Sequence, residues 1–193
     1  SGVFYDSRRV KPGGVFCALK GLGRDGHEFI QAAVENGAVA ILSEQPNPAA
    51  FLATWIQVGN GRAAMATAAA NFEGHPSRRF PVVGVTGTNG KTTTAFLVHH
   101  LMKAILHRAG LMGTICYSTG DSFLEASHTT PESTEVQRLL GEMAATDCRG
   151  AVMEVSSHGL AQHRVTGVAF DVGIFTNLTQ DHLDYHFTME DYF

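Results

Sequence analysis

The sequence predicts an α/β protein in which a small N-terminal α/β domain is followed by a second domain built on a parallel sheet. Short runs rich in β-branched residues alternate with segments of helical spacing along the whole chain. A polar segment with glycine and proline, residues 73–79, separates two such series and is the best linker. We therefore expect one domain over residues 1–79 and another over residues 80–193.

The first domain is expected to contain four strands and two longer helices. The expected strands cover residues 3–5, 15–19, 38–42 and 55–58. One helix starts near Phe29 and closes at Gly37, and an alanine-rich helix over residues 62–72 takes Asn60 as its N-cap. A further short helix is expected over residues 47–54.

The second domain is expected to form repeated β-α-β units and so a parallel sheet with right-handed crossovers. Strands are expected at residues 82–85, 111–117, 151–155 and 172–175, with a polar hairpin or loop over 118–127. The expected helices cover residues 91–109 and 133–145, and the second turns Val136, Leu139, Leu140 and Met143 inward. Ligands of such sheets bind at the carboxyl ends of the strands, where residues 87–93, 154–158 and 176–182 emerge.

Composition excludes several classes of function. The net charge is −4 and no long basic run occurs, so neither nucleic acid nor an anionic membrane is the expected partner. No apolar stretch is long enough to cross a bilayer and no signal peptide opens the chain, which predicts a cytoplasmic location without membrane insertion. Cys17, Cys116 and Cys148 are expected to be free thiols.

The segment between the strand at 82–85 and the following helix predicts an ATP-binding loop. Glycines and a helix start together direct backbone N–H groups at an anion, Lys91 can reach the β- and γ-phosphates, and the hydroxyl of Thr92 or Thr93 can bind Mg²⁺. Val85 stands where the strict Walker pattern requires glycine, so an ordinary βα turn is the competing interpretation. The expected ATP-binding residues are Gly87, Thr88, Asn89, Gly90, Lys91, Thr92 and Thr93.

The run Thr-Gly-Thr-Asn-Gly-Lys-Thr ending at Thr92 resembles the ATP loop of the Mur ligases, which build the peptidoglycan precursor. The run Met-Glu-Val-Ser-Ser-His-Gly-Leu around Glu154, followed by Gln162-His163-Arg164, resembles a segment of the MurE-type members. The resemblance implies that Glu154 serves the metal and that Ser156, Gln162 and Arg164 hold the UDP-muramoyl-peptide. On local sequence alone, a solvated glutamate at a strand end is the favoured interpretation of Glu154.

Two further motifs belong to the resemblance. Thr129 and Thr130 precede Pro-Glu, as in the family's substrate loop, although turn residues before a helix explain them equally well. The run from Thr176 to His186 resembles the family segment whose first histidine assists a second Mg²⁺, which implies that role for His182. Taken alone, His182 and His186 have the helical spacing of transition-metal ligands.

The resemblance extends into the first domain, where the MurE-type ligases hold the uridine diphosphate. Asp-Ser-Arg at residues 6–8 and the glycine-rich loop at residues 21–26 match that domain. Without the resemblance, Ser7 is as easily a cap or turn residue. The implied uridine-nucleotide contacts are Tyr5, Ser7, Leu22, Gly23 and Arg24.

The resemblance implies an ATP- and Mg²⁺-dependent ligase that joins a diamino acid, meso-diaminopimelate or L-lysine, to UDP-MurNAc-L-Ala-D-Glu through an acyl phosphate. The implied catalytic residues are Lys91, Glu154 and His182, and the implied metal ligands are Thr92, Glu154 and His182. The family continues with a carbamylated lysine and a further domain, so we expect a truncated ATPase domain and an inactive fragment. The alternatives are a non-catalytic P-loop nucleotide-binding module and another Mur-type or folate-type ligase.

Overall fold

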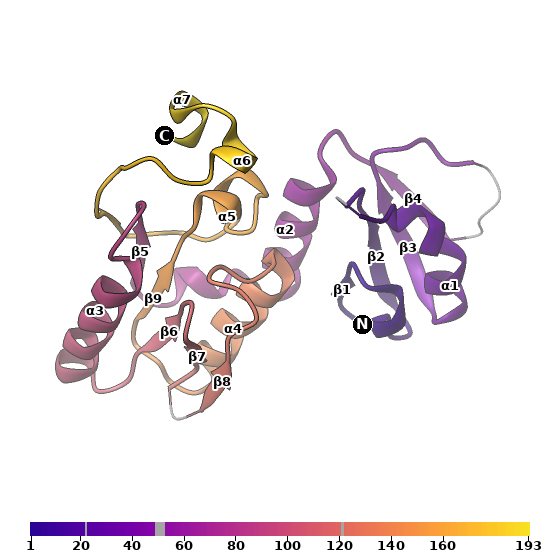
Figure 1. Cartoon of the computed structure of the whole chain (residues 1–193). Coiled ribbons are helices and arrows are strands. Elements are labelled where there is room, and N and C mark those ends of the chain that lie inside the picture. Colours follow the sequence, from indigo (N-terminus) through magenta and orange to yellow (C-terminus); the bar gives the residue numbers. More distant parts are fainter. Residues whose placement is uncertain (22, 49–52, 121) are drawn as a thin grey trace. The chain divides into compact units, whose positions relative to one another are not determined.

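The computed structural model describes residues 1–21, 23–48, 53–120 and 122–193. It divides into two compact units, Ser1–Gly74 and His75–Phe193, each with its own sheet (Figure 1). The division falls within the segment expected as a linker. After it, the short 3₁₀ helix η3 (Pro76–Arg78) packs against a helix of the second unit, and Ser77 Oγ accepts the amide of Ala169.

The sheet of the first unit is parallel throughout, in the order β1-β2-β3-β4. Its strands are β1 (Val3–Phe4), β2 (Gly14–Ala18), β3 (Ala38–Ser43) and β4 (Thr54–Gln57). Its helices are the 3₁₀ helices η1 (Ser7–Arg9) and η2 (Gly26–Phe29), followed by α1 (Ile30–Glu35) and α2 (Gly61–Phe72). The four expected strands are thus confirmed to within one residue at each end.

Helices cover both faces of this sheet. Phe16 and Ile41 pack on the α1 side, whereas their neighbours Cys17 and Leu42 pack with Met65 of α2. Successive residues of a strand point to opposite faces, so the near-continuous apolar runs of β2 and β3 fill two cores.

Two expectations for the first unit have different outcomes. Asn60 is confirmed as the N-cap of α2, because its side chain accepts the amide of Ala63 at 2.9 Å. Of the helix expected over residues 47–54, residues 49–52 lie outside the described part of the chain. Asn47 and Pro48 are not helical, and Thr54 already begins β4.

The second unit contains a six-stranded sheet in the order β10-β5-β9-β6-β7-β8. Its strands are β5 (Val82–Thr86), β6 (Gly110–Met112), β7 (Cys116–Ser118), β8 (Phe123–Glu125), β9 (Ala151–Glu154) and β10 (Val172–Phe175). Its helices are α3 (Lys91–Leu106), α4 (Ser133–Ala145), α5 (Ser157–Ala161), α6 (Leu183–His186) and α7 (Met189–Tyr192). The first four strands in this order are parallel.

The expected single strand over residues 111–117 is wrong. The chain turns after β6, and β7 returns antiparallel to it, followed by the antiparallel β8. A Cβ on Gly113 would lie 2.3 Å from Oε1 of Glu154, and the amide of Thr114 donates to that same oxygen. Because the Thr114 amide donates to this carboxylate, it does not donate to a neighbouring strand. With β7 and β8 antiparallel, the sheet is mixed and not wholly parallel as expected.

The two long helices of the second unit, α3 and α4, differ in how far their apolar side chains are buried. In α4, the inward positions Val136, Leu139, Leu140 and Met143 are fully buried, as expected. Helix α3 ends at Leu106, and the next residue, His107, has a positive φ of 65°, which no helical residue adopts. Its buried side is centred on Ala95 and His99, and three apolar side chains of the helical stripe face outward. These are Leu97, Leu101 and Ile105.

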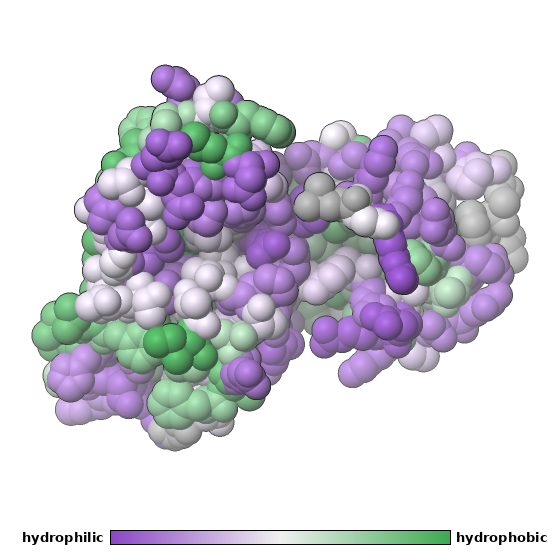
Figure 2. All heavy atoms as spheres, in the orientation of Figure 1, coloured by the Kyte–Doolittle hydropathy of each residue, from purple (hydrophilic) through white to green (hydrophobic). Residues whose placement is uncertain are grey.

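Apolar surface is visible over the region of α3, β7 and β8 in Figure 2. Exposed apolar side chains of that region include Ile115 and, on β8, Phe123 and Leu124. Within the described residues, no helix combines the length and apolar character needed to cross a bilayer. The three cysteines are free thiols, as expected.

Candidate functional site

The loop between β5 and α3 has the backbone that an anion site requires. Gly87 and Gly90 take φ of 124° and 84°, which side-chain-bearing residues rarely adopt. A Cβ on Gly87 would lie 2.3 Å from Thr176 Oγ1. Gly90 caps α3 without a side-chain hydrogen bond, so the first amides of this long helix face the loop with their partial positive charge.

The loop is held by the segment that follows β10. The amide of Thr88 donates to Asn177 O at 2.9 Å, and the Asn177 side chain bonds both the amide and the carbonyl of Asn89. Thr88 Oγ1 donates to Thr179 O and contacts the Tyr192 hydroxyl at 2.9 Å. Sequence reasoning assigned no role to Asn177 or Tyr192, because their partners lie about ninety to a hundred positions away in the chain.

Lys91 lies at the first position of α3 with its side chain folded over the loop. Its Nζ donates to the carbonyls of Gly87 at 2.7 Å and Thr88 at 2.8 Å. The amine is half-buried at the mouth of the loop. This places a positive charge beside the amides that would receive a phosphate.

Glu154 closes β9 and is fully buried, so the interpretation as a solvated strand-end glutamate is wrong. Its Oε1 accepts the amide of Thr114 at 2.9 Å. Its Oε2 accepts the hydroxyls of Thr92 at 2.8 Å and Thr114 at 3.1 Å. These donors are neutral, so none of them supplies a positive charge to the buried carboxylate.

The donors around Glu154 suit a hard cation. The Thr92 hydroxyl and the Glu154 carboxylate supply oxygen atoms, which Mg²⁺ prefers. The third predicted ligand, His182, packs its ring against His158 at 4.9 Å and Tyr192 at 6.0 Å between centroids. Among the described residues, no three His, Cys, Asp or Glu side chains are placed to hold a metal, so the transition-metal alternative at His182 and His186 finds no ligand set.

His158 lies at the centre of a ring cluster beside this site. It contacts His182, Tyr185 and His186. Burial lowers the pKa of His158, and the neighbouring histidines and Arg164 lower it further. The nearby Asp184 acts in the opposite direction, but the net effect is a pKa below the ordinary histidine value.

The predicted substrate residues of the second unit form one connected network. Thr130 Oγ1 donates to Glu154 O at 3.0 Å and accepts the amide of Ser156 at 2.9 Å. Arg164 donates to Thr130 O and to Gln162 Oε1, each at 2.8 Å. The interpretation of the threonine pair as mere turn residues is therefore incomplete, since Thr130 links the strand that carries Glu154 to Arg164.

Arg164 is nearly buried, and one of its N–H donors has no partner among the described residues. It forms an ion pair with Glu132 at 3.1 Å, and both side chains are less than a fifth exposed. Its Nε finds no hydrogen-bond partner within the described residues. A guanidinium held this firmly is preorganised to receive an anionic group.

In the first unit, the predicted nucleotide contacts follow neighbouring parallel strands. Tyr5 and Ser7 come directly after β1, and Gly23 and Arg24 come after β2, so they gather at the carboxyl edge of the sheet. Ser7 is buried, and its carbonyl accepts the Asn36 side chain at 3.0 Å. The predicted contact Leu22 lies outside the described residues.

The same edge carries a polar group that sequence reasoning missed. The His27 ring contacts Asp25 Oδ1 at 2.5 Å and Ser43 Oγ at 2.8 Å. The amide and ring of His27 lower the pKa of the Asp25 carboxyl. Ser43 ends β3, so three consecutive strands contribute polar residues to this edge.

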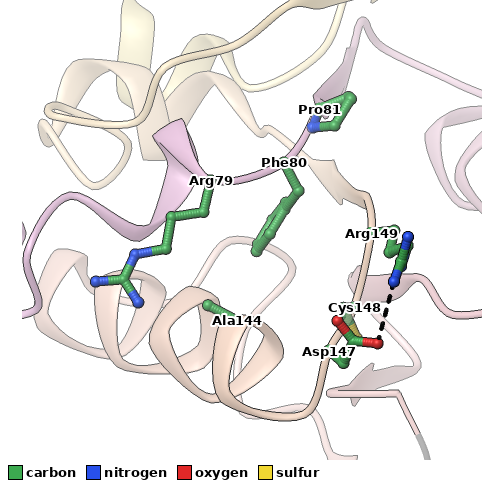
Figure 3. Close-up of a pocket in the computed structure, with 7 residues that line it drawn as sticks. All are labelled: Arg79, Phe80, Pro81, Ala144, Asp147, Cys148 and Arg149. Atoms are coloured by element: carbon green, nitrogen blue, oxygen red, sulfur yellow. Dashed lines mark ion pairs between the residues drawn. The ribbon is translucent and has the colours of Figure 1, made fainter.

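One pocket of the second unit contains none of the predicted residues. It has a volume of about 350 Å³ and lies at the amino ends of β5 and β9, away from the phosphate loop (Figure 3). Phe80 points into it, and Asp147 pairs with Arg149 at 3.6 Å. The lining residues are Arg79, Phe80, Pro81, Ala144, Asp147, Cys148 and Arg149.

Comparison with known proteins identifies relatives over the whole chain. A Geobacter metallireducens protein named UDP-N-acetylmuramoyl-L-alanyl-D-glutamate–2,6-diaminopimelate ligase is 51% identical over 196 residues, covering 100% of this chain and 38% of the relative. A solved structure of a ligase of that name is 33% identical with a TM-score of 0.83, over 99% of this chain and 39% of that chain. The chain thus spans about two fifths of their length.

A second solved structure is MurF ligase from Thermotoga maritima in complex with ADP. It is 25% identical with a TM-score of 0.64, over 99% of this chain and 40% of that chain. The Mur ligase middle domain matches residues 85–193, and the family described as "Mur ligase family, catalytic domain" matches residues 1–73. The phosphate loop, the buried carboxylate and both matches agree, and the chain belongs to the Mur ligase family.

Proposed function

We propose that this chain provides the nucleotide-binding and uridine-nucleotide-binding parts of an ATP-dependent ligase that joins 2,6-diaminopimelate to UDP-MurNAc-L-Ala-D-Glu. The observation that carries the proposal is the hydrogen bond from Thr92 on the phosphate loop to the buried carboxylate of Glu154. It brings an anion site and a candidate cation ligand together. The diamino acid is inferred from the name of the Geobacter relative.

The reaction has two steps. An oxygen of the substrate's terminal carboxylate attacks the γ-phosphorus of ATP, ADP leaves, and an acyl phosphate forms. The amine of the diamino acid then attacks the acyl carbon, inorganic phosphate leaves, and the nitrogen loses a proton as the amide forms. Both steps move negative charge onto phosphate oxygens, which fixed positive groups stabilise.

The residues of the phosphate loop would take the nucleotide. The amides at the start of α3 and the Lys91 amine would bind the β- and γ-phosphates, with Thr88, Asn89 and Thr93 lining the loop. Thr92 and Glu154 would hold Mg²⁺, which offsets charge on the phosphates when it is bound. His182, whose ring packs against His158, is the third residue that we propose for this group.

The network from Thr129 to Arg164 would hold the muramoyl-peptide beside the nucleotide. Arg164 offers N–H donors to a carboxylate or phosphate, and Thr130 fixes its position through its carbonyl. Ser156 and Gln162 complete the polar lining. In the first unit, Tyr5, Ser7, Gly23 and Arg24 would contact the uridine diphosphate at the carboxyl edge of the sheet.

The test is product formation by the protein expressed from its complete reading frame. With ATP, Mg²⁺, UDP-MurNAc-L-Ala-D-Glu and meso-diaminopimelate, we expect UDP-MurNAc-tripeptide and one phosphate per amide bond. L-Lysine in place of diaminopimelate serves as the matched control. ATP hydrolysis that does not depend on UDP-MurNAc-dipeptide, with no tripeptide, would refute the ligase proposal.

The role of the first unit is tested separately by NMR on the 193-residue chain. Adding UDP-MurNAc-L-Ala-D-Glu should shift the amides of Ser7, Gly23 and Arg24. Shifts confined to residues 75–193 would contradict the assignment of uridine-nucleotide binding to the first unit.

A further inference from the structure

Thr114 contacts the candidate metal carboxylate and the candidate substrate loop at once. It follows β6, in the turn that breaks the expected strand. Its amide donates to Glu154 Oε1 at 2.9 Å, and its hydroxyl donates to Glu154 Oε2 at 3.1 Å. The same hydroxyl lies 3.0 Å from the hydroxyl of Thr129. Thr114 therefore hydrogen-bonds both carboxylate oxygens of Glu154 and also contacts Thr129 of the candidate substrate loop.

The direction of these hydrogen bonds follows from the chemistry of the groups. The hydroxyl of Thr114 has a single proton, and it donates that proton to Glu154 Oε2. Thr129 must then donate its own proton to Thr114 Oγ1. The result is a one-way chain from Thr129 to Thr114 to Glu154, while Thr92 donates to the same Oε2 from the phosphate loop.

The surroundings leave the carboxylate little freedom to find another position. Glu154 is fully buried, and a Cβ on Gly113 would lie 2.3 Å from its Oε1. Thr130, the neighbour of Thr129, is itself tied to the Glu154 backbone carbonyl. A change at Thr129 is thus passed to the carboxylate through one hydroxyl.

We propose that Thr114 is a positioning residue that fixes the orientation of the Glu154 carboxylate and couples occupancy of the Thr129–Thr130 loop to nucleotide binding. The proposal rests on the proposed function for the identity of the two ligands. The coupling is transmitted by the hydroxyl group of Thr114 and does not depend on the size of the side chain. Groups that orient a metal-binding carboxylate typically contribute about 10- to 100-fold to metal affinity or activity.

The experiment compares Thr114→Val, which keeps the shape and the amide, with Thr114→Ser, which keeps the hydroxyl. Calorimetry on the protein from its complete reading frame measures Mg·ADP affinity, with and without UDP-MurNAc-L-Ala-D-Glu. We expect Thr114→Val to weaken Mg·ADP binding about 10- to 100-fold and to bring the effect of the dipeptide on that affinity close to none. Thr114→Ser should stay within about threefold of wild type on both measures.

Thr129→Val separates coupling from positioning. It removes the donor to Thr114 but leaves the Glu154 side chain its three hydrogen bonds, so Mg·ADP affinity without the dipeptide should fall less than in Thr114→Val. With the dipeptide at a concentration that saturates this variant, the effect of the dipeptide on Mg·ADP affinity should still be lost. Thr67→Val is the matched control, because the Thr67 hydroxyl bonds only the carbonyl of Ala63 among the interactions described for it on α2. It should match wild type throughout.

Three results would overturn the proposal. In the first, Thr114→Val keeps the wild-type Mg·ADP affinity and the wild-type effect of the dipeptide on it. In the second, Thr114→Ser is as impaired as Thr114→Val on both measures. If Thr114→Val does not fold, Thr129→Val decides, and unchanged coupling there is the third. Failure of the ligase proposal has a different signature, because a wild-type protein that binds Mg·ADP without forming tripeptide still permits the comparison of Mg·ADP affinity between Thr114→Val and Thr114→Ser.

Discussion

The hydroxyl of Thr92 donates to Oε2 of Glu154 at 2.8 Å, which joins the first turn of α3 to the end of β9. The two residues are 62 positions apart in the chain. Parallel neighbours β5 and β9 bring them together, because both strands end at the same edge of the sheet. The bond connects the buried carboxylate of Glu154 to the loop that we propose binds phosphate.

Glu154→Gln tests whether that charge serves a cation. The two hydroxyls at Oε2 can rotate and accept from the new amide, while the remaining carbonyl oxygen accepts the Thr114 amide, so the fold should persist. We expect Mg·ADP affinity to fall at least about tenfold. Calorimetry measures the affinity and circular dichroism the fold. Unchanged Mg·ADP affinity in a folded variant would exclude Glu154 from the metal site.

Lys91→Ala should abolish turnover with little loss of stability. The amine hydrogen-bonds two carbonyls of the loop and no core group, so its loss costs about 1–2 kcal/mol of folding free energy. Removing a preorganised charge from phosphoryl transfer should lower kcat by about 100- to 1000-fold. Phosphate release and thermal melting are compared with Lys103→Ala, on the last turn of the same helix. Near-native turnover would reject the phosphate-loop assignment.

Gly87→Ala should distort the phosphate loop. The new Cβ would meet Thr176 Oγ1 at 2.3 Å in a backbone region with φ of 124°, and strain of this kind costs about 1–3 kcal/mol. We expect weaker ADP binding together with a lower free energy of unfolding in urea. Gly173→Ala is the control, because a Cβ at Gly173 of the edge strand β10 meets nothing within 4 Å. Equal behaviour of the two variants would show that the loop tolerates the side chain.

The sequence predicted those parts of the fold that local pattern determines. The β-branched run before Gly87 and the apolar spacing after Lys91 were enough for the strand, loop and helix. The turn at Gly113 was not predictable, since a carboxylate forty positions away withdraws the Thr114 amide from the ladder. Burial of Glu154 was missed for the same reason. The residues that cover this strand end, Thr92 and Thr114, are distant in sequence and come together only in the folded sheet.

The outward stripe of α3 shows a different limit. Helical spacing predicts that one face is apolar, but it does not say which apolar face packs against the sheet. Leu97, Leu101 and Ile105 are more than half exposed, while the smaller Ala95 and the polar His99 are buried. The close approach of α3 to β9 favours small side chains, and His99 is accommodated because its Nε2 lies 3.0 Å from the carbonyl of Ala109.

His99 makes stability depend on pH in a predictable direction. Burial lowers its pKa below the ordinary 6.5, the nearby Lys103 and His100 lower it further, and the hydrogen bond to Ala109 offsets only part of this. Just below pH 6.5 the unfolded chain therefore binds more protons than the folded chain, and the free energy of unfolding falls as pH falls through this range. Burial also lowers the pKa of His158, which acts in the same direction.

His99→Gln should reduce this pH dependence, since glutamine does not titrate and its amide can still donate to Ala109 O. Urea unfolding is followed by circular dichroism at about pH 7.5, 6.5 and 5.5, which bracket the ordinary histidine pKa. The change in the free energy of unfolding with pH gives the slope for each variant. His107→Gln is the matched control, because His107 is exposed directly after the same helix and is not among the groups that shift the pKa of His99, so this variant should keep the wild-type slope. If His99→Gln loses as much stability as wild type between pH 6.5 and 5.5, His99 is not the titrating group, and the dependence must come from residues such as His158.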